Sequence, residues 1–192
     1  LSLSGSNTFS GGVTMAAGKL SVGADDNMGT GSLTFNGGQL EATNSFSTAK
    51  AAALSSSGTV GVTTSNTLTM TGVMSGTGAL TKADDGVLVL GGTNTYSGGS
   101  VMTAGTLSVA ADDNLGTGDL TFNGGALQAT GSFSSAKLAS LATAGTVNVS
   151  SGATLSLSGI VSGTGALTKG DAGVLALSGN NTYSGGTTMA SG

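Results

Sequence analysis

The residues N-T-Y-S-G-G at positions 94–99 decide how this sequence is interpreted, because close copies of them recur along the chain. Positions 7–12 read N-T-F-S-G-G and positions 181–186 read N-T-Y-S-G-G, so consecutive copies are 87 residues apart. The rest of the chain aligns at the same offset without a gap, as with S-G-T-G-A-L-T-K at 75–82 and again at 162–169. A fixed period of this kind indicates tandem repeats. We predict a first repeat at 1–87, a second at 88–174 and the start of a third at 175–192, in a fragment of a longer protein.

A shorter period lies inside each repeat. The triplets L-S-V at 20–22, L-E-A at 40–42, V-G-V at 60–62 and L-T-K at 80–82 step by 20 residues, and glycine-containing turns precede them. In a strand, the outer residues of such a triplet point to one side and the middle residue to the other. Glycine allows the sharp corners between strands. The pattern predicts an all-β fold, a parallel β-helix with about 20 residues per rung, four rungs per repeat and a rod ~45 Å long.

Two equivalent stretches depart from strand character. Residues 46–54 and 133–141 contain alanine, leucine and a lysine but no glycine. Alanine and leucine favour helix, so a helical turn or a small side excursion is expected there.

Composition excludes several classes of function. The chain has 5 basic residues, all lysine, and 9 acidic residues, which give a net charge of −4. The lysines are scattered, and nucleic-acid binding needs clustered positive charge, so no nucleic-acid partner is expected. Cysteine is absent, which removes disulfides and thiolate metal sites. The 38% of apolar residues is enough for a narrow core but not a broad one.

The stretch G-V-L-V-L-G-G-T-N-T-Y-S-G-G at 86–99, followed by A-G-T-L-S-V at 104–109, resembles the hallmark of the autotransporter-associated β-strand repeats, also called passenger-associated transport repeats. Positions 1–22 and 173–192 match the same hallmark. The resemblance implies a right-handed parallel β-helix at the Gram-negative cell surface or outside the cell. It also implies export through an outer-membrane translocation barrel in the parent protein.

The hallmark residues are predicted to be structural. A buried asparagine can satisfy backbone groups at a corner, and the aromatic residue two positions later can pack beside the rung. The residues concerned are Asn7, Gly11, Gly12, Asn94, Tyr96, Gly98, Gly99, Asn181, Tyr183, Gly185 and Gly186.

The acidic residues do not suggest an enzyme. Catalytic β-helices place carboxylates with a histidine or a basic residue at one departure from the repeat, whereas this chain lacks histidine and its main carboxylate pair recurs after 87 residues. We expect no catalytic residue and no cofactor. Calcium is an alternative at Asp25, Asp26, Asp112 and Asp113, whose oxygens suit that ion, although capping of turns is the commoner use of Asp and Asn.

We predict a structural or adhesive module of a surface protein, which supplies a rigid rod or fibre. Its expected partners are neighbouring repeats, other copies of itself, and host or environmental surface ligands. The alternatives are a subunit of a self-assembling extracellular filament, because neither end has a polar capping rung, and a non-catalytic part of a polysaccharide-acting β-helix enzyme. Sparse aromatic residues disfavour carbohydrate binding, and the threonines of 63–71 are not kept at 150–158, which disfavours ice binding.

Overall fold

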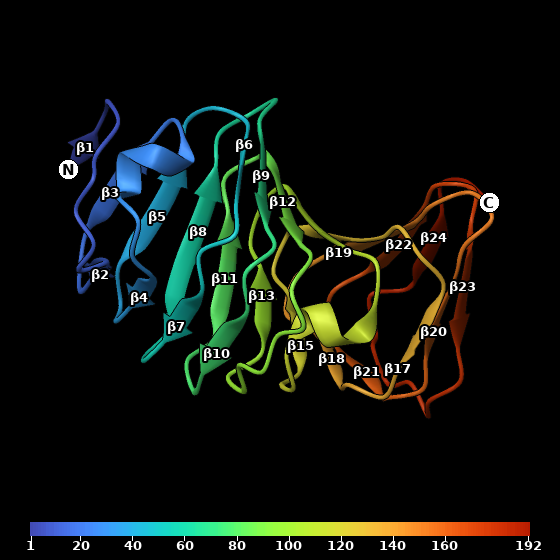
Figure 1. The fold of residues 1–192 in the computed structure, drawn as a ribbon. Helices are drawn as coiled ribbons and strands as arrows, with labels where there is room; N and C mark the ends of the chain where they lie inside the picture. The colour runs from blue at the N-terminus through green and yellow to red at the C-terminus, as the bar shows by residue number, and fades with distance from the viewer.

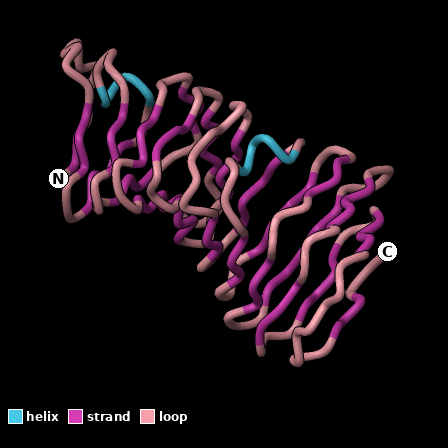
Figure 2. Tube along the Cα trace, turned by 90° about the horizontal axis from the view of Figure 1, so that it is seen from below, coloured by secondary structure: helices cyan, strands magenta, loops and turns pink.

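The computed structural model describes all residues from 1 to 192, and they wind into a parallel β-solenoid of about nine turns. The two termini lie at opposite ends of the rod (Figures 1 and 2). Strands one turn apart pair in parallel, as β3 and β5 do from Lys19 opposite Gln39 to Val22 opposite Ala42. The predicted all-β parallel β-helix with about 20 residues per rung is confirmed. Neither of the two short helical turns has the length and hydrophobicity of a membrane-spanning helix.

Three stacks of strands form the sides of the rod, and we name them faces I, II and III. Face I contains β2 (Val13–Met15), β4 (Leu33–Phe35), β7 (Ala52–Leu54), β10 (Met74–Gly76), β17 (Phe133–Ser135), β20 (Thr154–Leu157) and β23 (Val174–Leu177). Face II contains β1 (Ser2–Leu3), β3 (Lys19–Val22), β5 (Gln39–Ala42), β8 (Gly58–Val62), β11 (Leu80–Ala83), β13 (Ser100–Met102), β15 (Leu120–Phe122), β18 (Ala139–Leu141) and β21 (Val161–Gly163). Face III contains β6 (Phe46–Thr48), β9 (Thr67–Met70), β12 (Val87–Leu90), β14 (Thr106–Val109), β16 (Ala126–Ala129), β19 (Gly145–Val149), β22 (Leu167–Gly170) and β24 (Thr187–Met189).

Irregular segments continue the stacks where strands are missing. On face I, residues 94–97 lie above β10, since the Thr95 amide donates to the Met74 carbonyl at 2.8 Å. The 3-10 turn η2 (Asp112–Leu115) and the residues after it follow, and the Thr117 amide donates to the Tyr96 carbonyl at 2.9 Å. On face III, residues 7–9 and η1 (Asp25–Met28) precede β6 in the same way. On face II the strand ladder runs unbroken from β1 to β21, and the Thr182 amide continues it by donating to the Val161 carbonyl at 2.8 Å.

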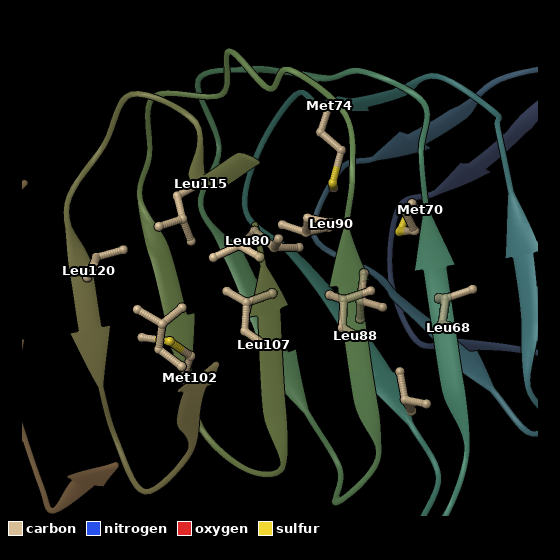
Figure 3. Packing of buried hydrophobic residues seen from close by; sticks show 14 of the residues in the cluster. Leu68, Met70, Met74, Leu80, Leu88, Leu90, Met102, Leu107, Leu115 and Leu120 are labelled. Atoms are coloured by element: carbon tan, nitrogen blue, oxygen red, sulfur yellow. The ribbon is translucent and has the colours of Figure 1, made fainter. Parts of the chain in front are cut away.

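The core is one narrow column inside the three faces. Burial alternates along the strands, and 36 buried apolar residues form a single cluster. Leu68, Leu88 and Leu107 come from adjacent strands of face III, lie in register and point inward together (Figure 3). Because each turn contributes only a few such side chains, a modest supply of apolar residues fills the column.

On face II, paired residues of successive turns are 20 positions apart for Leu40 and Val60, and this spacing increases to 22 in the next turn. Val60 pairs with Lys82, and Leu80 pairs with Gly58. The two additional residues lie in the turn after β8, where Ser65 takes a φ of 66°. A shift by two residues keeps each side chain on its original side of the sheet, so Leu80 and Lys82 both still point inward.

The helical turn expected in residues 46–54 and 133–141 is wrong. These stretches form β6, β7, β17 and β18. β7 is paired on both sides, with β4 and with β10. The hydrogen bonds of those ladders and the burial of Leu54 outweigh the helix preference of alanine, which is only about 0.5 kcal/mol per residue over most other residue types.

The expected four rungs per repeat also need a correction. The elements from β2 to β12 recur 87 residues later as β13 to β23. Counted from β2 up to the residues before β13, one repeat occupies thirteen positions in the stacks, namely the eleven strands β2 to β12, η1 and residues 94–97. Three positions make one turn. One repeat is therefore four and one-third turns, because 87 residues are not a whole number of 20-residue turns. As a result β2, β13 and β24, which are equivalent in sequence, lie on faces I, II and III.

Candidate functional site

The recurring feature of the chain is a corner built around the hallmark asparagine, here called the asparagine corner (residues 94–100 in the second repeat). Asn94 is buried, with 4% of its surface exposed. Its Oδ1 accepts a hydrogen bond from the Met74 amide of the turn below at 2.8 Å. Its Nδ2 donates to the Asn114 carbonyl of the turn above at 2.6 Å. One side chain thus joins three successive turns where regular strand pairing is interrupted.

The first and third corners make parts of the same arrangement. Asn7 donates through Nδ2 to the Asn27 carbonyl at 2.7 Å. Asn181 accepts through Oδ1 from the Val161 amide at 2.8 Å. Asn7 and Asn181 therefore each bond to one neighbouring turn and Asn94 to two, and the three equivalent asparagines lie on three different faces.

A second buried asparagine supports the first and the second corner from the adjacent 3-10 turn. Asn114 accepts from the amides of Ala110 and Ala111, both at 3.0 Å, and donates to the Gly92 carbonyl at 3.1 Å. Asn27 does the same in the first repeat. Turn capping was expected from the Asp-Asp-Asn sequence, and the structure assigns the capping of these amides to the asparagine.

Tyr96 fills the core instead of packing beside the rung. Its side chain is fully buried, and its hydroxyl lies 2.6 Å from Oγ of Ser100. Burial raises the pKa of Tyr96 to about 12, and the hydrogen bond with Ser100 opposes this shift. The hydroxyl therefore stays protonated at neutral pH and serves as a polar contact inside the core.

The glycine pair that ends the hallmark follows from the spacing of the turns. A Cβ added at Gly98 would lie 2.3 Å from the carbonyl carbon of Gly78 in the turn below. Gly99 has a φ of 85°, and a Cβ there would lie 2.6 Å from the Asp119 carbonyl oxygen in the turn above. Gly12 and Gly186 share the left-handed φ, with values of 78° and 81°, and Gly185 approaches Gly165 as Gly98 approaches Gly78. Only glycine fits both positions of an interior corner.

Two lysines inside the core were not recognised as special from the sequence. Lys82 is fully buried, and its Nζ donates to the carbonyls of Ala83 at 2.7 Å, Asp84 at 2.6 Å and Ala104 at 3.2 Å. Desolvation lowers the pKa of Lys82 to about 8, although nearby aspartates oppose this shift. Lys169 makes the equivalent contacts. The sequence feature that could have identified these lysines is the L-T-K triplet, because it places a lysine at an inward position of the strand.

The remaining lysines pair with carboxylates. Lys50 binds Asp25 and Lys137 binds Asp112, each at 2.8 Å between Nζ and a carboxylate oxygen. Lys19 pairs with Glu41, and their hydrogen bond raises the pKa of Lys19 and lowers that of Glu41.

The other two aspartates considered for calcium contact hydroxyl groups. Asp26 accepts from Ser6, and Asp113 accepts from Thr93 at 3.3 Å. No three acidic side chains gather at one point, and calcium binding at these aspartates stays a hypothesis.

One hollow is present, at the last turn, lined mainly by apolar residues that include Leu167, Val174, Leu177 and Met189. It is continuous with the core column. The arrangement of the corners, lysines and core as a whole is suited to joining one turn to the next.

The asparagine corner coincides with a known repeat. Three segments of the chain, 1–22, 80–109 and 167–192, match the passenger-associated-transport-repeat family, and each contains one asparagine corner. These three segments are similar to the passenger-associated-transport repeat. The resemblance drawn from the hallmark at 86–109 is thereby confirmed, and the middle repeat match spans β11, β12, the corner, β13 and β14.

A similarity to another protein extends over more of the chain than these three repeat matches. The chain is 38% identical over 122 residues to the "Adhesin BmaC autotransporter" of Brucella suis biovar 1. The alignment covers 62% of this chain and 4% of that relative, so the chain spans only a small part of the relative's length. No solved structure matches the chain.

Proposed function

We propose that this chain is a length of the rod-shaped, adhesive passenger of a bacterial autotransporter, displayed at the cell surface or outside the cell. The observation that carries the proposal is the unbroken core column, which asparagine corners bridge at intervals of 87 residues. The matching repeat family and the adhesin relative support the same function. In this function the parent protein supplies the outer-membrane translocation barrel.

The chemistry of the chain favours a mechanical role over a catalytic one. The lysines bind carbonyls or carboxylates of the solenoid, and the buried polar groups of the corners bridge turns. Successive turns are about 4.8 Å apart, so each repeat adds about 21 Å to the rod. The number of repeats therefore determines how far the adhesive end stands from the cell.

A series of surface-displayed rods tests this function. Two, four and six repeats, built in phase from residues 1–174, are placed between an outer-membrane barrel and a terminal epitope, and the height of the epitope is measured by atomic force microscopy. Adhesion of the cells to a surface is scored in parallel. The control is a Gly/Ser linker with the same number of residues. Doubling the repeat number should double the height of the rod, whereas doubling the length of the linker should increase its end-to-end distance by a factor of only about 1.4. A height that follows the square root of length would refute the rod.

A further inference from the structure

The outward side chains of the strands form ladders that carry almost no charge. On face III one ladder has one residue per turn in register: Thr67, Val87, Thr106, Ala126, Thr146, Thr168 and Thr188. On face II the corresponding ladder begins with the charged Lys19 and continues with the uncharged Gln39, Thr59, Thr81, Val101, Thr121, Ser140 and Ser162. On face I the ladders are Thr14, Thr34, Ala53 and Ser75, and then Ser134, Ser156 and Ala176. These side chains are at least partly exposed.

The charged side chains are placed elsewhere. All eight aspartates, together with Lys50 and Lys137, lie in turns between strands. The remaining charged groups are the buried Lys82 and Lys169 and the exposed pair of Lys19 with Glu41 on face II. The corners therefore carry the net negative charge, whereas the flat sides are almost neutral.

This distribution favours a second copy of the chain as the partner of a flat side. Two copies have the same charge of −4, so they repel each other at their corners and least where their neutral sides meet. Hydroxyl groups both donate and accept hydrogen bonds, so two threonine ladders are mutually compatible. Both ladders also have the same spacing of one residue per turn.

A glycan is the weaker candidate. Sugar rings bind by stacking on exposed aromatic side chains, and Tyr96 is buried inside the rod. The ladder residues themselves contain no aromatic ring.

The one-third turn left over by each repeat distributes the same surface over all three sides. Equivalent strands of successive repeats appear on faces I, II and III in turn, so no side keeps a composition of its own. A contact that suits one side consequently suits the other two.

We propose that the solenoid associates laterally with copies of itself through all three flat sides, so that assembly grows into bundles instead of stopping at pairs. This inference rests on the proposed rod function and adds the partner of its sides. Seven turns, about 34 Å, multiplied by the length of a strand, about 12 Å, cover about 400 Å² per partner, roughly half of a standard interface. Two repeats therefore bind weakly, and binding strengthens as repeats are added.

Sedimentation velocity and electron microscopy of two-repeat and four-repeat rods test the proposal. In the two-repeat rod, aspartates are placed in the ladders of one side (Thr106→Asp with Thr146→Asp), of a second side (Thr81→Asp with Thr121→Asp), or of all three sides, the third carrying Thr34→Asp with Ser156→Asp. In the four-repeat rod the second pair of repeats is rotated by two-thirds of a turn, so its substitutions are made at the positions that continue the same side and not at the same repeat positions. The control for a one-side variant adds the same two charges in exposed corners, with Ser55→Asp and Ala142→Asp. The control for the three-side variant adds six, with Ala16→Asp, Asn36→Asp, Asn123→Asp and Ser178→Asp in addition. Circular dichroism verifies that each variant is folded.

The four-repeat rod should form side-by-side bundles, and added salt should enlarge them because it screens the corner carboxylates. A one-side variant should still associate, while the three-side variant should lose roughly tenfold or more in self-affinity and remain single. The corner control should behave like the parent. Single rods of full length in the parent, complete loss in a one-side variant, or weakening by salt would each overturn lateral bundling and leave the rod function standing. Compact or unfolded particles would contradict both.

Discussion

At the scale of single residues, the aromatic positions of the three corners show that the hydroxyl pair of the corner varies between repeats. Tyr96 faces Ser100 and Tyr183 faces Thr187, with 2.6 Å between the oxygens in both pairs. In the first repeat the equivalent positions hold Phe9 and Val13, and neither has a hydroxyl. The polar pair is therefore kept or removed as a unit, which agrees with the high free-energy cost of leaving one buried polar partner alone.

Breaking this pair from one side should be costly. The substitution Tyr96→Phe leaves the buried Ser100 hydroxyl without its main partner and should lower the free energy of unfolding by about 1–2 kcal/mol. Adding Ser100→Val recreates the Phe9 and Val13 combination and should recover most of the loss. Denaturant unfolding measures both variants. A double variant as unstable as the sum of the single ones would show that the two hydroxyls are independent.

Lys82 should make stability depend on alkaline pH. Its pKa is about 8 in the folded chain and 10.5 as the ordinary value, so between these pH values the unfolded chain binds more protons. The free energy of unfolding contributed by this group should therefore rise from pH 8 to pH 10.5, by up to about 3 kcal/mol. Unfolding of the parent and of Lys82→Met is compared across this window. Equal slopes in the two proteins would contradict the assignment.

At the scale of elements, the sequence predicted the strands better than the register. The alternation of apolar and polar residues around Leu20, Leu40 and Val60 indicates which side chains point inward. The 20-residue spacing of these three residues then predicts the length of a rung. The pairing of Val60 with Lys82 could not, because it depends on two residues inserted in a turn and not on any apolar position.

The site showed the same division between local and non-local information. The hallmark asparagines and glycines could be selected from their recurrence, whereas the partners of Asn94 lie 20 residues away on both sides. Lys82 was missed because a lysine at an inward position is satisfied only by carbonyls that the folded corner brings together. Alanine-rich residues 46–54 were misassigned because pairing with other turns overrides local propensity.

Gly98 in the asparagine corner gives a prediction with a control inside the same chain. Gly98→Ala brings a methyl group within 2.3 Å of the Gly78 backbone, so the turns must separate, at a cost of about 2 kcal/mol or more. Gly11 is the equivalent residue of the first repeat, and a Cβ there meets nothing within 4 Å. Gly11→Ala should therefore leave the melting temperature nearly unchanged. Similar losses in both variants would mean that backbone freedom, and not the close approach, requires glycine.

At the scale of the whole molecule, the residual one-third turn is the feature that no repeat alignment reveals. Sequence identity aligns Thr81 with Thr168, yet these residues belong to β11 on face II and β22 on face III. Residues that share a side are instead about 20 positions apart, such as Thr106 and Ala126. Comparison of equivalent residues therefore gives no information about the composition of a side, which also applies to the threonines of 63–71 and 150–158.

Labelling can make this rotation visible. The chain has no cysteine, so a six-repeat rod with one cysteine per repeat, at the position of Thr81, can carry one gold particle per repeat. Electron microscopy should show particles about 21 Å apart along the axis that project from three sides in turn. A single straight row of particles would mean that each repeat closes a whole number of turns.

The fractional turn also affects how such a protein changes in length. Unequal recombination between similar gene segments adds or deletes units of 87 residues. Gain or loss of one unit moves the part of the protein beyond it by about 21 Å along the rod and rotates it by one-third of a turn about the rod axis. Three units together restore the original direction. Copy-number variation would then alter the direction in which any segment beyond the repeats points as well as its distance, whereas allelic lengths that differ by multiples of three repeats would preserve that direction.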